Sequence, residues 1–381
     1  MRLMTLVSVV AVSLIGAGCE QKAAPPKPLE AKTFVLITRW GPADVEKGAR
    51  GAADSATAIN VVQTRDAKTQ VDELTRIATA GDVHGVAIDC VAAPEVAAAV
   101  RQCVKAGVPV VTYNGDCPGA NRAGVRQPAE IAADPGRHSF VGTRLEEVAR
   151  LMGAQLLKQF ADVRGVVAIV SAPTDEYPNL KVIEDAVTAY LKDVPDLTVR
   201  APVRPATQPD AVAAAIKGVL QQESSVRGWI ILNPAAAPDA TAAPLDSLSN
   251  AVVVMLGVSD TVLGAVTPEK VDVLVSLPVM AYGSAAIQML TGIVRHHRNY
   301  ADETYVGPDI VTISNVEAVQ KRRSRMRAGE ISAEVVPSGG PKPGQTTPGA
   351  EPPAEPAPAP VEPVPAPEPP ADTGGGDATE G

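Results

Sequence analysis

The chain is poor in the residues that build metal centres, disulfide frameworks and aromatic cores. Its 381 residues include only 4 Cys and 4 His, and aromatic residues make up 3%. So few cysteines exclude a small disulfide-rich scaffold and argue against an array of zinc fingers. Basic residues are not in excess either, because the formal net charge is −9. We therefore expect no positive surface for nucleic acid and predict no nucleic-acid partner.

Most of the negative charge belongs to the C-terminal end of the chain. Residues 337–381 contain 14 of the 35 prolines, seven acidic residues and one lysine, so this tail carries a charge of −6. A segment of Pro, Ala and Glu cannot bury a core, and we predict a disordered tail over residues 337–381. The residues before it have an ordinary globular composition and are numerous enough for two domains.

The N-terminus has the pattern of an export signal. Arg2 precedes a short apolar run, Leu3–Ile15, and three small residues then lead to Cys19. The run is too short for a stable membrane span. Small residues before a cysteine resemble the lipobox of bacterial lipoproteins, which implies cleavage before Cys19 and lipidation of its thiol. An ordinary cleaved signal is the alternative. We predict a signal peptide over 1–18, a tether over 19–31, and an exported protein of the cell envelope or periplasm that is lipid-anchored to a membrane.

Short runs rich in Val and Ile recur along the middle of the chain without alternating with polar residues. Such runs are typical of strands buried on both faces of a parallel sheet. Helical patterns separate them, which predicts right-handed crossovers and an α/β fold. Ten runs are too many for one sheet of this length, so we predict two doubly wound parallel-sheet lobes. The runs are Phe34–Thr38, Ile59–Gln63, Gly85–Asp89, Pro109–Tyr113, Ser139–Gly142, Val166–Ser171, Leu197–Ala201, Trp229–Leu232, Val252–Leu256 and Val271–Ser276.

Two helices have informative sequence patterns. Thr143 and Glu146 have the spacing of a capping box, which predicts a helix start at this point. After a last strand-like run, Asp309–Ile313, residues 314–330 form a predicted helix with the basic run Lys321–Arg327. A nucleic-acid or lipid-headgroup patch is one interpretation of that run, and a solvated helix face is the favoured one.

Several sequence blocks, in order, resemble the ribose-type periplasmic sugar-binding proteins, which have the type I periplasmic binding protein fold. The resemblance covers about residues 32–316. Its blocks are GVPVVTYNGD at 107–116, SFVGT at 139–143, and the segments Val252–Gly257 and Val271–Pro278 followed by Tyr282-Gly283. It implies two lobes joined by three crossovers, with a ligand cleft between them. We expect lobe one to span 32–138 with 278–300, lobe two to span 139–277 with 301–316, and a basic helix and linker to cover 317–336.

The candidate site follows from where ligands bind in such folds. In open parallel sheets they lie beyond the C-terminal ends of the strands. There, aromatic rings can stack on a sugar, while amides and carboxylates bind its hydroxyls. The alternative is that these are ordinary loop residues, since Asn and Asp favour turns. The candidates are Trp40, Tyr113, Asn114, Asp116, Tyr177, Asn179, Asn233 and Asp260.

The resemblance assigns roles to some of these residues and not to others. Asp116 matches the family's ligand-binding Asp, and Asn233 matches its Asn. Where the family has an Arg, this chain has Ile183, and where it has a Gln before a Pro, this chain has Ser276. The family's second-lobe Asp falls at Ser259, with Asp260 one residue later. These departures leave open a different sugar, a less polar small molecule, or no ligand at all.

Other functions have less support. The chain has no GxSxG, P-loop, HExxH or paired-cysteine motif, so we predict neither enzyme activity, nor a metal, nor a cofactor. A DNA-binding repressor of this fold would carry a helix-turn-helix where this chain has an export signal. We expect a monomer that presents a sugar-like ligand to an ABC permease. A degenerate lipoprotein acting as a sensor or scaffold is the second hypothesis.

The cysteines allow one further prediction. Cys90 and Cys117 each follow a strand end, and those strands are neighbours in this fold. An exported protein meets an oxidising compartment, so we predict a disulfide between Cys90 and Cys117. Cys103 falls within a helical pattern and is interpreted as a small buried hydrophobe. Three reduced buried cysteines are the alternative.

Overall fold

The computed structural model describes residues 29–39, 42–117, 136–160, 164–174, 177–237, 242–248, 250–257, 261–266, 270–328 and 330. The chain divides after Ser338 into two units, and all the described residues lie in the first. The predicted signal peptide, Cys19 and the tail over 337–381 lie outside the described residues, as do Trp40 and Asp260. None of the described helices has the length and apolar composition needed to span a bilayer.

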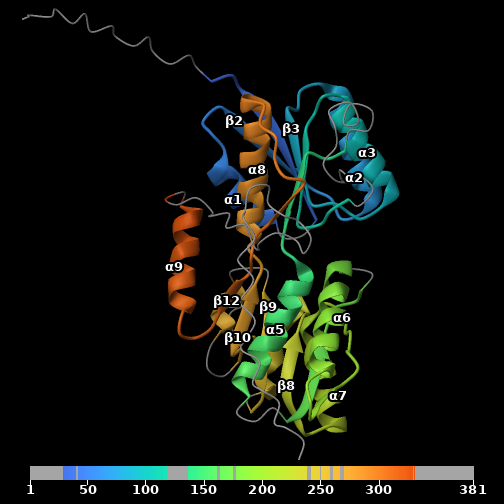
Figure 1. Cartoon of the computed structure of the whole chain (residues 1–381), viewed down its shortest axis with the longest axis vertical. Coiled ribbons are helices and arrows are strands. Elements are labelled where there is room, and N and C mark those ends of the chain that lie inside the picture. The colour runs from blue at the N-terminus through green and yellow to red at the C-terminus, as the bar shows by residue number, and fades with distance from the viewer. Residues whose placement is uncertain are drawn as a thin grey trace, which may run out of the picture. The chain divides into compact units, whose positions relative to one another are not determined.

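The described strands form two six-stranded sheets (Figure 1). Sheet one has the order β11-β5-β4-β3-β1-β2, and sheet two has the order β12-β10-β9-β8-β6-β7. All neighbouring strands are parallel except β12, which runs antiparallel to β10. In sheet one the strands are β1 (Lys32–Thr38), β2 (Thr57–Gln63), β3 (Gly85–Ile88), β4 (Val110–Tyr113), β5 (Ser139–Gly142) and β11 (Glu303–Tyr305). In sheet two they are β6 (Gly165–Val170), β7 (Leu197–Val199), β8 (Val226–Ile231), β9 (Val252–Gly257), β10 (Val273–Ser276) and β12 (Asp309–Val311).

Helices cover both faces of each sheet, so each sheet has two hydrophobic cores. The helices packed on sheet one complete lobe one, and those packed on sheet two complete lobe two. In lobe one they are α1 (Pro42–Ala52), α2 (Ala67–Ala80), α3 (Pro94–Lys105) and α8 (Val279–His296). In lobe two they are α5 (Leu145–Gln159), α6 (Pro178–Lys192), α7 (Pro209–Gln222) and α9 (Val316–Arg327), with the 3-10 turns η2 (Pro234–Ala236), η3 (Ala243–Leu248) and η4 (Thr261–Ala265). Burial on both faces explains the continuous Val and Ile runs. The predicted fold class is confirmed.

The chain passes between the sheets three times, after β5, after β10 and after β11. The predicted lobe boundaries need one correction. Residues 139–142 and 303–305 were assigned to lobe two, yet β5 pairs with β4 and β11 pairs with β5, so both strands belong to sheet one. A strand belongs to the lobe whose sheet it hydrogen-bonds to, and the spacing of strands along the sequence does not show which strands pair.

The predicted capping box at the start of α5 is wrong. Arg144 is the N-cap of this helix, and no side chain caps it. The Thr143 hydroxyl instead donates to the carbonyl oxygen of Val306 and bonds to the hydroxyl of Tyr282. Thr143 therefore connects the end of β5 to the segment after β11 and to α8. It does not accept a hydrogen bond from a backbone N–H at the start of α5.

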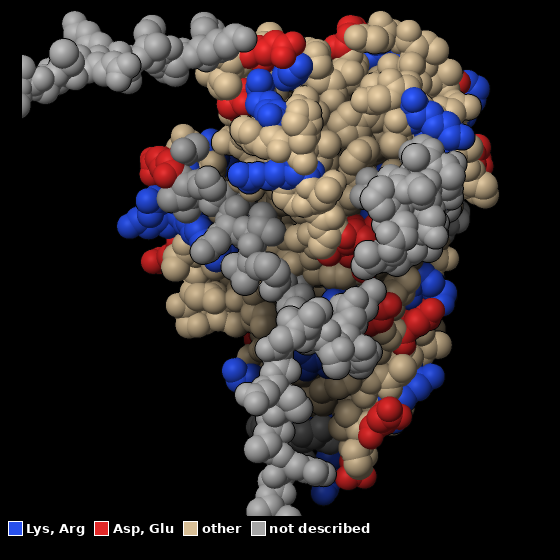
Figure 2. Space-filling view, turned by 45° about the horizontal axis from the view of Figure 1, so that its top comes forward, with Lys and Arg blue, Asp and Glu red and all other residues tan. Residues whose placement is uncertain are grey.

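The basic run lies on α9, which packs on lobe two and also contacts lobe one through Met326. Val316 and Val319 pack into a core of sheet two, and Arg323 donates to Ser276 Oγ at 2.9 Å. Arg323 also lies 3.3 Å from a carboxylate oxygen of Asp309. On the face seen in Figure 2, Lys and Arg side chains are interspersed with Asp and Glu. These contacts support the interpretation of α9 as a packed helix with a solvated face.

Candidate functional site

A cavity of about 350 Å³ is lined by residues from both lobes. Strand order reverses on either side of β1 in sheet one and of β6 in sheet two, and such switch points open a crevice at the carboxyl ends of the strands. Thr38, Arg39 and Asp89 line the cavity from the ends of β1 and β3, and Leu232 lines it from the end of β8. The topology therefore places this cavity where parallel sheets bind ligands.

The floor in lobe one is a buried ion pair. Arg39 Nη2 lies 3.0 Å from Asp89 Oδ1, and their side chains are 8% and 4% exposed. Asp89 also accepts from the side-chain amide of Asn114 at 3.2 Å and from the backbone N–H of Gly115 at 3.1 Å. Burial raises the pKa of Asp89, against the opposing effect of Arg39 and these hydrogen bonds. Because the two charges compensate each other, the ion pair presents little net charge to a ligand.

Neighbouring groups hold this floor in place. The Gln70 side chain donates to the backbone oxygen of Asp89 and accepts from the backbone N–H of Val91, both at 2.8 Å. The Tyr113 hydroxyl donates to the backbone oxygen of Ile37 at 2.9 Å. Burial raises the pKa of Tyr113 well above its usual range, with the Asp89 charge adding to the effect. Asn114 has φ 56°, a left-handed conformation that Asn tolerates better than most residues.

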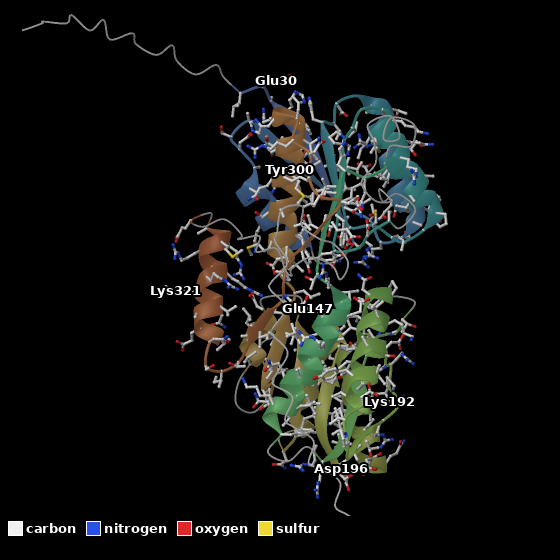
Figure 3. All side chains as sticks on the ribbon, viewed as in Figure 1. Glu30, Glu147, Lys192, Asp196, Tyr300 and Lys321 are labelled. Carbon is white, nitrogen blue, oxygen red and sulfur yellow. The ribbon has the colours of Figure 1, made fainter. Side chains whose placement is uncertain are left out.

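Most of the described residues that line the cavity from lobe two are apolar. Eight apolar residues line the cavity from this lobe, and we call them the apolar wall: Leu145, Pro178, Leu180, Ile183, Leu232, Pro234, Leu256 and Leu277. The helix starts contribute to it, because α5 begins at Leu145 and α6 begins at Pro178. Figure 3 shows Glu147 near the end of lobe two where α5 begins, and Lys192 and Asp196 at the opposite end of that lobe.

A comparison with protein families identifies the chain. The model of the periplasmic binding protein domain matches residues 40–297, which is more than half of the chain. This protein belongs to the periplasmic binding protein domain family. No curated protein matches the chain in a sequence search.

Solved structures give the same fold for this periplasmic binding protein. It is similar to an ABC transporter solute-binding protein from Burkholderia graminis C4D1M in complex with D-arabinose, with 19% identity, a TM-score of 0.63, and coverage of 76% of this chain and 98% of that one. A solute-binding protein from Actinobacillus succinogenes 130z with bound D-allose has 15% identity, a TM-score of 0.63, and coverage of 76% and 100%. A putative LacI transcriptional regulator from Bacteroides fragilis has 13% identity, a TM-score of 0.62, and coverage of 76% and 99%. At these identities the likeness establishes the fold alone.

Four of the predicted site residues line the cavity of this periplasmic binding protein: Tyr113, Asn114, Tyr177 and Asn179. The first two come from the end of β4 and its following turn, and the other two come from the start of α6. The strand-end rule therefore found residues from both lobes that share one cavity. Two further candidates, Trp40 and Asp260, lie outside the described residues.

Asp116 is not among the lining residues, and its carboxylate has other partners. Arg137 donates to it twice, from Nε at 2.6 Å and from Nη2 at 2.7 Å. Thr112 Oγ1 and the backbone N–H of Cys117 donate to the same carboxylate, both at 2.8 Å. The side chain of Arg137 is fully buried and also bonds Asp302 at 2.8 Å. This ion-pair network orients Asp116 toward β5 and the segment before β11 and away from the described lining, so its contact with a ligand stays a prediction.

Asn233 is also absent from the lining. It is fully buried, and its side-chain amide donates to the backbone oxygens of Ser171 and Pro205 at 3.1 and 3.2 Å. Its side-chain oxygen accepts from the backbone N–H of Ala235 at 3.0 Å and so caps η2. Asn233 therefore joins three loops at the carboxyl end of sheet two. Its neighbours in sequence, Leu232 and Pro234, face the cavity instead.

The three described cysteines are buried free thiols. The predicted bond between Cys90 and Cys117 is therefore not formed in the structure, although their thiols are close enough to interact. Burial raises the pKa of Cys90, and the contact with Cys117 adds to this. The neighbourhood was predicted correctly, and the disulfide itself stays a prediction for the oxidised protein. Cys103 is a buried residue of the lobe-one core, as interpreted from the sequence.

Sequence reasoning missed the three charged residues of the described lining: Arg39, Asp44 and Asp89. Arg39 and Asp89 directly follow β1 and β3, so the strand-end rule applied to them as well. Asp44 lies in the first turn of α1, where an acidic residue has an ordinary structural explanation. Among the described residues, no three His, Cys, Asp or Glu side chains are grouped as they would be around a metal ion.

Proposed function

We propose that this protein captures a small solute between its two lobes and presents it to an ABC-type permease at the cell envelope. The cavity of about 350 Å³ carries this proposal, because it lies within the range of small-molecule sites and both lobes contribute to its lining. A solute that contacts both lobes stabilises a closed arrangement, and a closed arrangement is the state that a permease can distinguish from the empty one. The solved relatives bound to D-arabinose and D-allose make sugars the first class to test.

A thermal-shift screen of the full mature chain against sugars, polyols and their glycosides tests the proposal. Binding stabilises the native state by about 2.7 kcal/mol when the ligand is at one hundred times its Kd, so a weak ligand at high concentration is detectable. We expect a saturable rise in melting temperature with at least one compound. If the whole panel leaves the melting temperature unchanged, the capture function is wrong.

Lipid anchoring at Cys19 belongs to the same proposal. The small residues before Cys19 and the Pro- and Lys-bearing tether after it support this anchor. Intact-mass analysis of the membrane fraction should give a mature chain that begins at Cys19 and carries acyl chains. A free thiol at Cys19, or cleavage at another residue, would contradict it.

A sensor or scaffold lipoprotein is the second candidate. It is favoured by the internal partners of Asp116 and Asn233, which leave fewer polar groups for a sugar. Small-angle scattering on the full chain separates the two functions. A receptor becomes more compact when the compound found in the screen is added at saturation, whereas a scaffold keeps its dimensions.

A further inference from the structure

The two sides of the cavity differ in chemistry. Lobe one contributes all the charged residues of the described lining, Arg39, Asp44 and Asp89, together with Asn114 and apolar residues such as Val45 and Val279. Lobe two contributes the apolar wall, whose polar exceptions in the described lining are Tyr177 and Asn179. A ligand held between the lobes therefore meets polar groups on one side and hydrocarbon on the other. This asymmetry constrains the chemical class of the ligand.

A free sugar suits this arrangement less well than a ligand with one hydrophobic end. A monosaccharide carries a hydroxyl on almost every carbon, so some of its hydroxyls would face the apolar wall. Each hydroxyl buried there without a partner would weaken binding roughly tenfold. Within the described lining, Tyr177 and Asn179 are the polar side chains that lie beside the apolar wall. Ile183 and Leu256 are 1% and 4% exposed, and both pack into the core that α5 and α6 form on sheet two.

The polar side has a defined preference. Arg39 directs Nε and Nη2 at the carboxylate of Asp89, and Asn114 directs one amide N–H at that same carboxylate. No described residue donates to the side-chain oxygen of Asn114 or to the carboxylate of Asp44. The side-chain oxygen of Asn114 and the carboxylate of Asp44 are therefore acceptors left for a ligand on this side, and a matching ligand presents hydrogen-bond donors to them.

We infer that the cavity binds an amphipathic small molecule. Its polar end donates hydrogen bonds to Asp44 and Asn114, and its aliphatic or aromatic body lies against the apolar wall. A hydrophobic glycoside, with a sugar at one end and an aryl group at the other, is a compound of this class. The inference rests on the proposed capture function and narrows its ligand.

Matched pairs of compounds test the ligand class. Calorimetry on the full mature chain would compare methyl and phenyl β-glycosides of glucose, galactose and mannose, with the free sugars alongside. For at least one sugar we expect the phenyl glycoside to bind at least tenfold more tightly than the methyl glycoside, because only the phenyl ring reaches the wall. Free sugars or methyl glycosides that bind as tightly as the phenyl compounds would overturn the inference and leave the capture function intact. A complete lack of binding across these compounds would overturn the ligand class, and the wider thermal-shift screen decides the capture function separately.

A pair of variants on one helix tests the wall. Leu180 lines the cavity from α6, while Val187 is a core residue of the same helix outside the lining. Leu180→Ala should weaken phenyl glycoside binding about three- to tenfold and change methyl glycoside binding less than twofold. Val187→Ala should leave both affinities unchanged, even where it lowers stability. Equal effects of Leu180→Ala on both glycosides would show that the phenyl ring does not contact the wall.

A second pair tests the polar end. Asp44→Asn removes the charge of one acceptor, so it should weaken the methyl and phenyl glycosides by the same factor, about tenfold. Glu46, two residues later in α1, pairs with Arg50 at 2.7 Å outside the cavity lining, and Glu46→Gln serves as its control. Unchanged affinities in Asp44→Asn would overturn the assignment of the polar end.

Discussion

The network around Arg137 leads to a prediction about Asp116 that separates a structural role from a ligand-binding one. Arg137 has no exposed side-chain surface, and its two carboxylate partners, Asp116 and Asp302, are 24% and 30% exposed. The ring centroid of Phe140 lies 5.7 Å from the guanidinium carbon of Arg137, so the ring covers one face of the guanidinium. Asp116→Ala removes one of the two carboxylates and leaves the buried guanidinium with Asp302 alone.

The size of the effect follows from burial. Breaking a buried ion pair by removing one partner costs about 3–5 kcal/mol, because the remaining charge keeps its desolvation penalty. Asp302 still compensates part of the charge of Arg137, so we expect Asp116→Ala to lower the free energy of unfolding by about 3 kcal/mol. The matched control is Asp185→Ala. It breaks an i,i+4 pair with Lys181 whose side chains are 60% and 44% exposed, and such pairs contribute about 0.3–0.5 kcal/mol.

Urea unfolding followed by circular dichroism measures both variants, and calorimetry measures ligand affinity in parallel. We expect Asp116→Ala to shift the urea midpoint well below that of wild type and of Asp185→Ala, while ligand affinity is retained below the transition. Asp116→Ala with wild-type stability and lost binding would refute this reasoning and place Asp116 at the ligand.

Three further predictions concern the helix packing and the thiols. A Cβ on Gly48 would lie 1.9 Å from a backbone oxygen of α8, so Gly48→Ala should destabilise by roughly 1–3 kcal/mol. Gly51→Ala, which meets no atom within 4 Å on the same helix, should be neutral or stabilise by up to about 1 kcal/mol in the same urea assay. Burial raises the pKa of Cys103 to about 12, so iodoacetamide at pH 8 should leave it unmodified until the protein is unfolded. Peptide mapping of the exported protein without reductant should yield a Cys90–Cys117 link, and a Cys90–Cys103 link or three alkylatable thiols would contradict that pairing.

The strands that sequence patterns predicted best are those buried on both faces. Val252–Gly257 and Gly165–Val170 are nearly continuous apolar runs, because helices cover both sides of sheet two. Strand β11 has the sequence ETY and is partly exposed throughout, so it lacks the apolar run that marks the buried strands. It pairs with the edge of β5, and residues 303–305 reach that edge only once the chain has returned from lobe two.

The site could be predicted only in part for similar reasons. Strand ends are recognisable in sequence, which located Asn114 and Tyr177. The direction in which a side chain points is not recognisable in sequence. Asn114 and Asp116 differ in that direction, because Asn114 faces the cavity and Asp116 faces Arg137. The leucines of the apolar wall were also missed, because Leu256 at the end of a buried strand looks the same in sequence whether it faces core or cavity.

Blocking the cavity tests the central claim, that the solute binds between the lobes. Leu145 and Leu157 both lie on α5 and pack partly buried against the same core, but only Leu145 lines the cavity. Calorimetry would compare Leu145→Trp and Leu157→Trp with wild type, using the tightest ligand found in the screen. We predict that Leu145→Trp abolishes binding, because the indole fills the cavity, and that Leu157→Trp binds like wild type. Wild-type affinity in a folded Leu145→Trp protein would place the ligand elsewhere and contradict the account.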